Sequence, residues 1–539
     1  MGKNLPDSWI EIPLADTGQW VGGGTPRKSE SRFWEGSIPW VSPKDMKKLC
    51  VVDTEDHISE AAVQESAVKL IRPGAVLFVT RSGILAHSFP VATTKMPVTV
   101  NQDLKAIIPY SVISPDYLAW CLRANARNIL NSCSKHGTTV HSIEIPSLKE
   151  WSICIPPVKE QCRIVDKIET LFSELDKGIE ALKTAREQLK VYRQAVLKQA
   201  FEGKLTARWR EENKDKLESP EQLLDRIKHE REARYQKQLR DWKSAVVEWE
   251  KSDRASKKPS KPSQVKTLPS ITQDELEILP NLPEGWIYAR LAEISRIGSG
   301  MSVSKARKLQ EPVEIPYLRV ANVQRGALVL DEIKTMQVER SSLNDLMLEK
   351  WDVLFNEGGD RDKLGRGWIW EGQIDPCITQ NHVFRAMPYL ASDFHSKFIS
   401  NWGNTFGKQY FEKGGKQTTN LASINKGVLS MFPVPVPSMT EQKLLIEMLE
   451  DTMTLIESLE HEVEIGVAKS ETLRQSILKK AFSGQLLPQD PNDESGATLL
   501  ERIHLEKEAR DSQGEGRKGD RRKSVNKSKE KRNATLQPG

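Results

Sequence analysis

The chain contains the same sequence module twice. Residues 5–14 read LPDSWIEIPL, and residues 282–291 read LPEGWIYARL. Near the far end of the module, RQAVLKQAFEGKL (193–205) matches RQSILKKAFSGQL (474–486). An internal repeat of this length constrains the fold more than any single motif does, because it predicts two structurally related halves.

Size and composition fit such a duplicated protein. At 539 residues the chain is too long for one core, since single cores rarely grow beyond about 250–300 residues. Its mean hydropathy is −0.51, and no apolar run approaches the ~20 residues of a membrane helix. The opening residues, MGKNLPDSW, lack the apolar stretch of a signal peptide. We therefore expect a cytoplasmic protein without membrane contact.

Cysteine and charge give few functional signals. None of the six cysteines forms a CxxC pair, and only Cys377 lies in the second copy. Ligands that the module needs should occur in both copies, so we expect free thiols and no metal site. The net charge of +5, from 79 basic and 74 acidic residues, suits a polyanionic partner but does not demonstrate one.

Each copy opens with a mixed α/β pattern. Short β-rich runs such as GAVLFVT (74–80) and WDVLFNE (351–357) alternate with helical stretches and with Gly and Pro. The fold class is therefore α/β, with two globular domains, two long helices and connecting segments. The expected boundaries are 1–157, 158–204, 205–276, 277–437, 438–485 and 486–539.

A long helix closes each copy. Residues 160–203 and 441–484 contain no proline, and each range has 44 residues (203 − 160 + 1; 484 − 441 + 1). Apolar residues recur in them every seven positions, which predicts a coiled coil about 66 Å long. The alternative is an amphipathic helix on its own domain. The expected seam is Ile168, Leu175, Leu182, Leu189, Val196, Leu449, Ile456, Val463 and Ile477.

Segments of different character follow the long helices. Residues 219–252 predict a helix with Ser219 as its N-cap, and the matching repeat in the second copy is ESGATLLERIHLEKEAR (494–510). The Lys/Pro/Ser-rich residues 253–266 and the basic residues 517–532 predict disordered segments.

Common catalytic motifs are missing from the sequence. It has neither a GxxxxGK[ST] phosphate loop nor an HExxH zinc motif. The stretches VGGGTP (21–26) and IGSGMS (297–302) predict permissive turns. The acidic DEIK (331–334) could imitate part of a nuclease site, but the first copy has no equivalent. The sequence therefore favours a binding protein over an enzyme.

The repeated order of these strings resembles the specificity subunit of type I restriction–modification enzymes. The strings are LPDSW, GGGTP, IPWVS, IPPVKEQ and QAFEGKL, with LPEGW, IPYLR, VPSMTEQ and KAFSGQL in the second copy. The resemblance covers nearly all of residues 5–510.

This resemblance implies a non-catalytic subunit that binds double-stranded DNA. Each globular part would be a target-recognition domain for one half of a bipartite, asymmetric site. The long helices would pair as an antiparallel coiled coil with pseudo-two-fold symmetry and set the spacer. Two modification subunits would bring S-adenosylmethionine, and two restriction subunits would bring ATP and Mg, so no cofactor is expected on this chain.

Base-reading residues should lie where the copies differ, because base edges carry the sequence information. Trp9 and Trp286 occur in both copies, so we assign them to the shared frame. The alternative to DNA contact, for any single loop residue, is a solvated surface position without a function. The candidates are Ser42, Lys44, Asp45, Arg81, Lys135, His136, Thr138, Arg319, Asn322, Gln324, Arg361, Lys363, Arg366, Lys413, Lys416 and Gln417.

Two other functions compete with this interpretation. One is a single-chain DNA methyltransferase or endonuclease of a type II-like system, which would bind S-adenosylmethionine itself. The other is a structural coiled-coil adaptor, which would not change its DNA specificity when loops 134–142 or 356–367 were exchanged.

Overall fold

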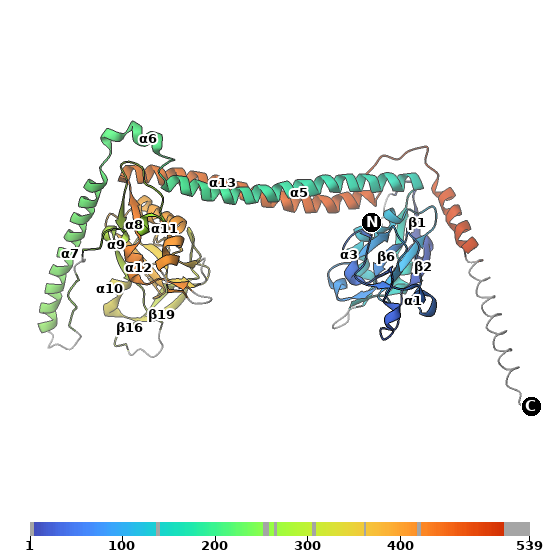
Figure 1. Ribbon diagram of the computed structural model, residues 1–539, viewed down its shortest axis with the longest axis horizontal. Coiled ribbons are helices and arrows are strands. Elements are labelled where there is room, and N and C mark those ends of the chain that lie inside the picture. The colour runs from blue at the N-terminus through green and yellow to red at the C-terminus, as the bar shows by residue number, and fades with distance from the viewer. Residues whose placement is uncertain are drawn as a thin grey trace, which may run out of the picture. The chain divides into compact units, whose positions relative to one another are not determined.

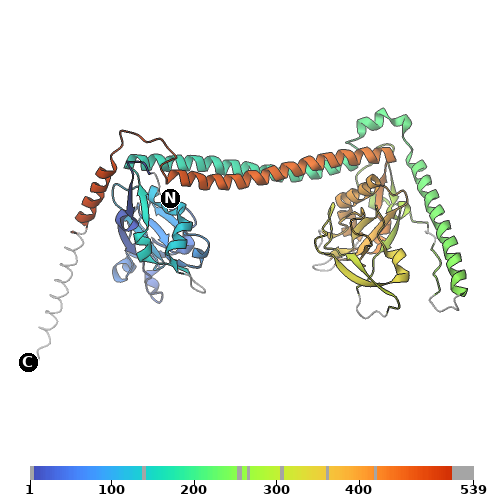
Figure 2. The same ribbon diagram turned by 180° about the vertical axis from the view of Figure 1, so that it is seen from behind.

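The computed structural model describes most of the chain, in two compact units (Figure 1, Figure 2). Unit 1 comprises residues Met1–Lys183 and Glu464–Gly539, and unit 2 comprises Thr184–Val463. The described residues are 5–135, 141–251, 258–263, 267–303, 309–359, 363–414, 416–417, 422–510 and 512. Each unit is considered by itself.

The globular part of unit 1 is built on a five-stranded sheet. Its order is β2 (Gly18–Gly22), β10 (Leu104–Pro109), β6 (Val76–Val79), β8 (Val91–Thr94) and β4 (Cys50–Val51). The VLFV of β6 is buried at all four positions, because the strand is central and side chains from α2 (Pro115–Ala124) also pack in this core. The smaller helices are α1 (Glu60–Glu65), α3 (Ala126–Cys133) and α4 (Ile145–Glu150).

Three smaller sheets complete this part of unit 1. β1 (Ile10–Pro13) pairs antiparallel with β13 (Ser152–Ile155), so the start of the module lies beside its last strand. The two others are β5 (His57–Ile58) with β3 (Ile38–Val41) and β9 (Thr99–Val100), and β11 (Ser134–Lys135) with β12 (His141–Ile143) and β7 (Arg81–Ser82).

Unit 2 repeats this plan. Its main sheet has the order β15 (Ser295–Ser299), β24 (Val383–Pro388), β20 (Val353–Asn356) and β22 (Gly367–Ile369). β14 (Ile287–Arg290) pairs antiparallel with β27 (Pro433–Val436), as β1 does with β13. The other sheets are β19 (Lys334–Glu339) with β16 (Pro312–Leu318) and β23 (Ile378–Thr379); β21 (Gly358–Gly359) with β26 (Ala422–Ser423) and β25 (Lys416–Gln417); and β17 (Val323–Gln324) with β18 (Ala327–Leu328).

Helices cover the sheets of unit 2. The longest of the globular part is α11 (Asp393–Gly414), which buries Phe398, Trp402 and Phe411. The shorter ones are α8 (Gln273–Leu276), α9 (Leu291–Ile294), α10 (Leu343–Leu346) and α12 (Lys426–Met431).

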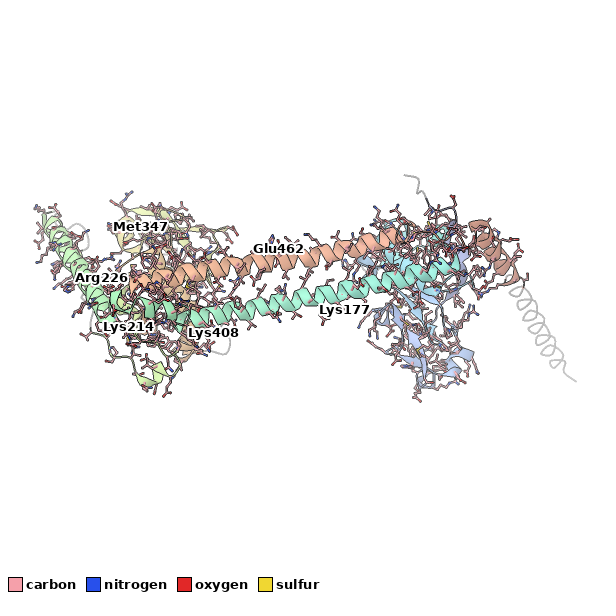
Figure 3. The ribbon with its side chains drawn as sticks, turned by 90° about the horizontal axis from the view of Figure 1, so that it is seen from above. Lys177, Lys214, Arg226, Met347, Lys408 and Glu462 are labelled. Atoms are coloured by element: carbon pink, nitrogen blue, oxygen red, sulfur yellow. The ribbon has the colours of Figure 1, made fainter. Side chains whose placement is uncertain are left out.

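The predicted long helices are present as α5 (Val158–Phe201) and α13 (Met439–Ala481), within three residues of the proline-free ranges 160–203 and 441–484 (Figure 3). Polar side chains such as Lys177 and Glu462 are exposed on them. Of the predicted seam, Ile168, Val196, Leu449, Ile456 and Ile477 are buried, and Leu175, Leu182, Leu189 and Val463 are half-buried.

Within each unit, part of α5 lies against part of α13. In unit 1 Arg474 forms an ion pair with Asp176, and a Cβ on Gly466 would lie 3.0 Å from the side chain of Leu182. In unit 2 Arg193 forms an ion pair with Glu460 at 3.1 Å. Because the early part of each helix contacts the late part of the other, the two run antiparallel where they meet.

The segments that follow the long helices complete the opposite module. Phe201, at the end of α5, packs against Trp402 with ring centroids 5.5 Å apart. The next helix, α7 (Pro220–Lys251), is predicted correctly from the sequence and buries Leu223 and Ile227 in the core of unit 2. The short α6 (Ala207–Glu212) lies between α5 and α7.

The end of α13 does the same in unit 1. Phe482 packs against Tyr117 with ring centroids 5.4 Å apart, and Leu499 and Ile503 of the helical residues 496–510 lie in the core of unit 1. Each globular part is therefore closed by residues that follow the long helix of the other module.

A buried tryptophan–glutamate hydrogen bond holds each module to its long helix. The indole N–H of Trp9 donates to Glu160 Oε2 at 3.0 Å, and that of Trp286 donates to Glu441 Oε2 at 2.9 Å. Burial raises the pKa of the Glu160 carboxyl, although hydrogen bonds from Gln489 and Trp9 oppose this. The structural assignment of both tryptophans is confirmed.

Two further expectations can be compared with the structure. All six cysteines are free thiols, as predicted. Among the helices of the described residues, none is long and apolar enough to span a bilayer. The predicted basic tail 517–532 and much of the linker 253–266 lie outside the described residues.

The tryptophan–glutamate bond predicts a matched pair of stability effects. Trp286→Phe removes the N–H donor and leaves Glu441 with one partner fewer, so unit 2 should lose about 2–3 kcal/mol of unfolding free energy. Trp9→Phe should destabilise unit 1 by a similar amount. Differential scanning calorimetry measures both, and unchanged transitions in the two variants would refute the role of this bond.

Candidate nucleic-acid interface

A small three-stranded sheet joins two predicted loop regions in each unit. In unit 1, Arg81 of β7 lies opposite Ser142 of β12, which in turn lies opposite Lys135 of β11. In unit 2 the corresponding strands are β21, β26 and β25, with Gly358 opposite Ser423 and Ser423 opposite Lys416. The polar run after the VLF strand and the polar run before the long helix therefore meet in both copies.

Backbone hydrogen bonds connect this sheet to two more loops in unit 1. The N–H of Ile143 donates to Thr80 O at 2.8 Å, and the N–H of Thr80 donates to Asp103 O at 2.7 Å. The N–H of Gly24 donates to Val100 O at 2.9 Å. Four segments, residues 23–25, 80–82, 101–103 and 141–143, thus form what we term the loop junction of unit 1.

Unit 2 has the same junction. The N–H of Ile424 donates to Glu357 O at 2.8 Å, and the N–H of Glu357 donates to His382 O at 2.9 Å. The N–H of Met301 donates to Thr379 O at 2.9 Å. The loop junction of unit 2 therefore consists of residues 300–302, 357–359, 380–382 and 422–424.

These bonds fix the register between the copies. Asp103 and His382 accept equivalent hydrogen bonds, so Asn101-Gln102-Asp103 matches Gln380-Asn381-His382. From the sequence, Gln102-Asp103 pairs with Gln380-Asn381, and the structure corrects that pairing by one residue. A backbone register of this kind is visible only in the hydrogen bonds, because the aligned side chains differ.

The glycine-rich turns 21–26 and 297–302 border the two junctions. Glycine is required in them, but for a different reason from the permissive turn that the sequence predicts. A Cβ on Gly23 would lie 1.7 Å from Asn101 O, and one on Gly300 would lie 2.0 Å from Thr379 O. Neither residue has a left-handed φ. Glycine is needed here for the close approach of two backbones, not for a permissive turn.

In unit 1 two candidate side chains lie at the junction, one lies on a neighbouring loop, and two are outside the part of the chain that the structure describes. Arg81 is exposed at the junction. Lys135 is also exposed, but it forms an ion pair with Glu144, and this bond lowers the pKa of the Glu144 carboxyl. Lys44 pairs with Glu55 at 3.0 Å on the neighbouring loop. His136 and Thr138 lie outside the described residues.

In unit 2 the candidates are more widely spread. Lys363 and Arg366 are half-buried beside β22, and Lys413 is exposed at the end of α11, where it donates to Asp274 O at 3.3 Å. Lys416 and Gln417 form β25, of which only the backbone is described. Arg361 lies outside the described residues.

Several candidates use their polar atoms inside their own loops. Ser42 is 4% exposed, and its N–H and Oγ both bond to Asp45 Oδ2 at 2.8 Å. Asn322 is 3% exposed and bonds to the backbone of Val329 and Glu332. These three side chains support their loops and are unsuited to contacting bases, which corrects their selection from the sequence.

The side chains of the remaining two candidates, Arg319 and Gln324, each use part of their hydrogen-bonding capacity within the protein. Arg319 donates to Glu332 O at 3.2 Å, and the Gln324 amide donates to Ala321 O at 2.7 Å. Both are half-buried, which leaves part of each side chain accessible.

Sequence reasoning missed polar residues at the centre of the junctions. Gln102 in unit 1 and His382 in unit 2 are exposed, and Asn381 is half-buried. His382 Nδ1 lies 2.6 Å from Glu357 Oε2. A signal was present, because these residues stand at matched positions just before the equivalent strands β10 and β24 and differ between the copies.

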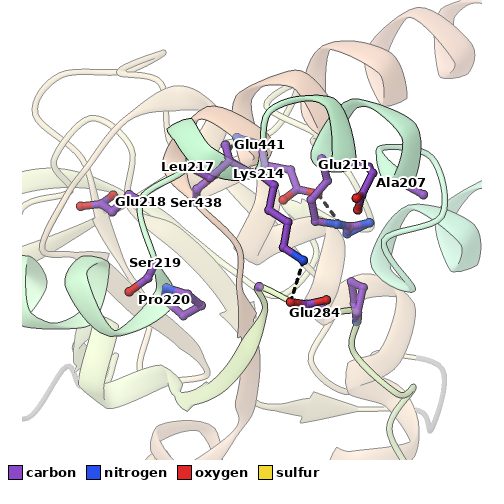
Figure 4. Close-up of a pocket in the computed structure, with 13 residues that line it drawn as sticks. Ala207, Glu211, Lys214, Leu217, Glu218, Ser219, Pro220, Glu284, Ser438 and Glu441 are labelled. Carbon is purple, nitrogen blue, oxygen red and sulfur yellow. Dashed lines mark hydrogen bonds and ion pairs between the residues drawn. The ribbon is translucent and has the colours of Figure 1, made fainter.

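A separate pocket of about 360 Å³ lies in unit 2 beside the start of α13 (Figure 4). Its charged groups pair with one another: Lys214 with Glu284 at 2.9 Å, and Arg210 with Glu441 at 3.2 Å. Because these cations are neutralised within the protein, the pocket is less suited to an anionic ligand than the junctions are.

The two units share one backbone frame and carry different polar loops, which defines a class of protein with two related surfaces of different side-chain composition. The sequence model described as the type I restriction modification DNA specificity domain matches residues 6–184 and 283–465. The chain therefore belongs to the family of type I restriction–modification specificity subunits. It is a DNA-recognition subunit and not an enzyme, which sets aside the single-chain methyltransferase or endonuclease.

Individual relatives agree with this assignment. The specificity subunit of the Escherichia coli type I restriction enzyme EcoR124I/EcoR124II is 40% identical over 185 residues, which cover 33% of this chain and 46% of that protein. The specificity subunit of EcoKI, from Escherichia coli strain K12, is 23% identical over 96% of this chain and 99% of its own length.

Two solved structures share the fold at 16% identity. One comes from a study of complex assembly and conformational transition of the type I R-M system, with a TM-score of 0.57 over 90% of this chain and 100% of that chain. The other is the HsdS subunit from Thermoanaerobacter tengcongensis, with a TM-score of 0.52 over 89% of this chain and 98% of that chain.

The close backbone approach at Gly23 predicts a local defect in the junction. Gly23→Ala should force the 101–103 loop away and cost about 1–3 kcal/mol, with loss of DNA affinity in the assembled complex. Gly83→Ala, in a nearby position where a Cβ meets no atom within 4 Å, is the matched control. Fluorescence anisotropy with cognate DNA compares the two, and equal affinities would contradict the assignment.

Proposed function

We propose that the chain reads a bipartite, asymmetric DNA site, with one half-site contacted by the loop junction of each unit. The observation that carries this proposal is the junction itself. The same four backbone segments meet in both units through equivalent hydrogen bonds, while their exposed side chains differ. A conserved frame with different side chains supports two different half-sites.

The side chains at the junctions suit base recognition. In unit 1, Arg81 is suited to guanine and Gln102 to adenine, because each can form paired hydrogen bonds with the major-groove edge. The Gln102 amide bonds to Thr25 and Asp103 in the free chain, but the side chain is exposed, so it would exchange these bonds for the base. In unit 2, Asn381 is suited to adenine, and Arg366 and His382 can contact guanine. Lys363 and Lys413 are better suited to phosphates, which position the duplex without reading it. Lys44 and Lys135 are proposed for the same role, in which each would exchange its ion pair with Glu55 or Glu144 for a phosphate.

The other sequence candidates keep more limited roles. Arg319 and Gln324 are proposed to contact the duplex from the β16 side of unit 2. His136, Thr138, Arg361, Lys416 and Gln417 remain DNA-contact proposals that rest on the sequence.

The long helices are proposed to form an antiparallel coiled coil with pseudo-two-fold symmetry that sets the spacer between the half-sites. The predicted heptad seam and the antiparallel contacts Arg474–Asp176 and Arg193–Glu460 support this. In this scheme two modification subunits, which bind S-adenosylmethionine, dock on the repeated frame. Two restriction subunits, which use ATP and Mg, complete the enzyme.

The reading role predicts separable specificity changes. Gln102→Ala should relax one half-site and leave the other intact, and Asn381→Ala should do the reverse. Each loss of a bidentate contact should cost about 1–3 kcal/mol of discrimination at one base pair. The measurement is the map of methylated bases in cells that express the variant with its modification subunit.

The control for this experiment is Gln236→Ala, which removes an exposed amide on α7 away from the junction segments. Its methylation map should equal that of the wild type. A Gln102 or Asn381 variant that retained full discrimination at both half-sites would refute the assignment of these residues.

The spacer role predicts a coupled length effect. Deleting residues 179–185 from α5 together with 463–469 from α13 removes one heptad around the Leu182–Gly466 contact. The helices should each shorten by about 10 Å, and the spacer should lose roughly 3 base pairs of ~3.4 Å each. Deleting only one heptad should impair folding, and an unchanged spacer after the paired deletion would rule out the spacer role.

A further inference from the structure

Four cations gather on one flank of unit 2. Arg231 and Arg234 lie on α7, Arg296 lies on β15, and Lys426 is the first residue of α12. The short helix α9 brings these elements together, because it packs against α7, β15 and α12.

Tyr389 lies at the centre of this group. The Arg234 guanidinium lies 5.9 Å from the ring centroid and also donates to Tyr389 O at 2.7 Å. Burial raises the pKa of the Tyr389 hydroxyl, and the charges of Arg231, Arg296 and Arg234 oppose this rise. The three guanidinium groups therefore lie within electrostatic range of one ring.

Lys426 extends the cluster toward α12. Partial burial and the nearby Arg296 guanidinium both lower the pKa of its ammonium group. Two like charges are thus held close enough to repel each other, which favours a partner with negative charge.

The protein itself supplies little of that negative charge. Arg234 pairs with Glu230 at 2.9 Å, but Arg231, Arg296 and Lys426 have no ion pair among the residues that the structure describes. Glu293, close by on α9, accepts a hydrogen bond from the backbone N–H of Arg290 at 2.7 Å. Its carboxylate is used as a helix cap.

The matching flank of unit 1 keeps two of the four cations and lacks the other two. Arg510 corresponds to Arg234 and lies 5.2 Å from the ring centroid of Tyr110. Lys507, which corresponds to Arg231, forms an ion pair with Asp16 at 2.5 Å. Gln19 stands where unit 2 has Arg296, and Ile145 stands where unit 2 has Lys426. Because the frames match, these two cations are additions specific to unit 2 and are not needed to build the fold.

The cluster is continuous along the chain with the loop junction of unit 2. Arg296 lies on β15 and precedes Gly300 by four residues, and Lys426 follows Ile424 by two residues. Both Gly300 and Ile424 belong to that junction. A duplex held at the junction would therefore have a cationic surface leading away from it.

We propose that Arg231, Arg234, Arg296 and Lys426 form a cationic track that binds the phosphate backbone of DNA next to the half-site read by unit 2. This inference rests on the proposed function. The track adds affinity without sequence information, because phosphates are the same at every base pair. It would make the contact with flanking DNA asymmetric, since Arg296 and Lys426 have no basic counterpart in unit 1.

The test replaces two cations with the residues of unit 1, as Arg296→Gln and Lys426→Ile in one variant. The complex with its modification subunits is titrated with duplex DNA at several NaCl concentrations. Two lost phosphate contacts should reduce the slope of log affinity against log salt by about 1.8, because each contact contributes about 0.9. The methylated sequence should stay the same.

A charge-matched control is Lys237→Gln with Lys243→Gln, two exposed positions farther along α7. Its slope should stay near that of the wild type. A wild-type slope in the Arg296/Lys426 variant, with the site still read, would overturn the track alone. Loss of modification-subunit binding with an unchanged slope would also overturn it, in favour of a protein contact. Failure of the wild-type complex to discriminate its site would instead contradict the proposed function.

Discussion

The buried carboxylate at the start of each long helix is the constraint on which the rest of the architecture depends. A carboxylate that is 1% exposed is costly unless it is well bonded, and Glu160 and Glu441 each accept the indole N–H of the module's first tryptophan. The second partner differs. Gln489 bonds to Glu160, whereas Thr206 and Arg210 contact Glu441. Three chain segments are tied together at one point, and the loop junction of each unit is built on the frame that results.

This arrangement separates the parts of the protein that must stay the same from those that can vary. The frame uses backbone hydrogen bonds, a buried VLF strand and glycines that permit close backbone approach, and these features occur in both copies. Some junction side chains belong to this frame, since Thr80 Oγ1 donates to Asp103 O and the Asp103 N–H donates to Asn101 Oδ1. Exposed side chains such as Arg81 and Gln102 lie outside these backbone bonds and can differ between the copies. Under the proposed function, this allows the DNA specificity to differ between the two halves of one chain.

Sequence reasoning recovered the features that have a long-range pattern. The duplication, both long helices and the helix α7 were all readable, because repeats, heptads and capping residues extend over many positions. The strands of the junction sheet are too short for this, since β7 and β11 contain two residues each and have no periodicity. From the sequence, Ser42 and Asn322 are candidates for base contacts, because the sequence does not show whether a polar loop side chain bonds to its own loop or to a ligand. In the structure both bond within their own loops. The sequence also could not predict that the residues after each long helix pack in the core of the other module. Because the two copies are equivalent in sequence, either pairing fits the pattern.

This packing of each closing segment in the other module has a consequence for how the protein is made. Unit 2 is a continuous stretch of chain, so a ribosome that has passed residue 463 has already supplied all of it. The core of unit 1 contains Leu499 and Ile503, which are synthesised after all of unit 2. Translation of unit 1 therefore begins before that of unit 2 but is completed after it, and until residues 496–510 emerge the core of unit 1 keeps an apolar gap at the place where Leu499 and Ile503 pack.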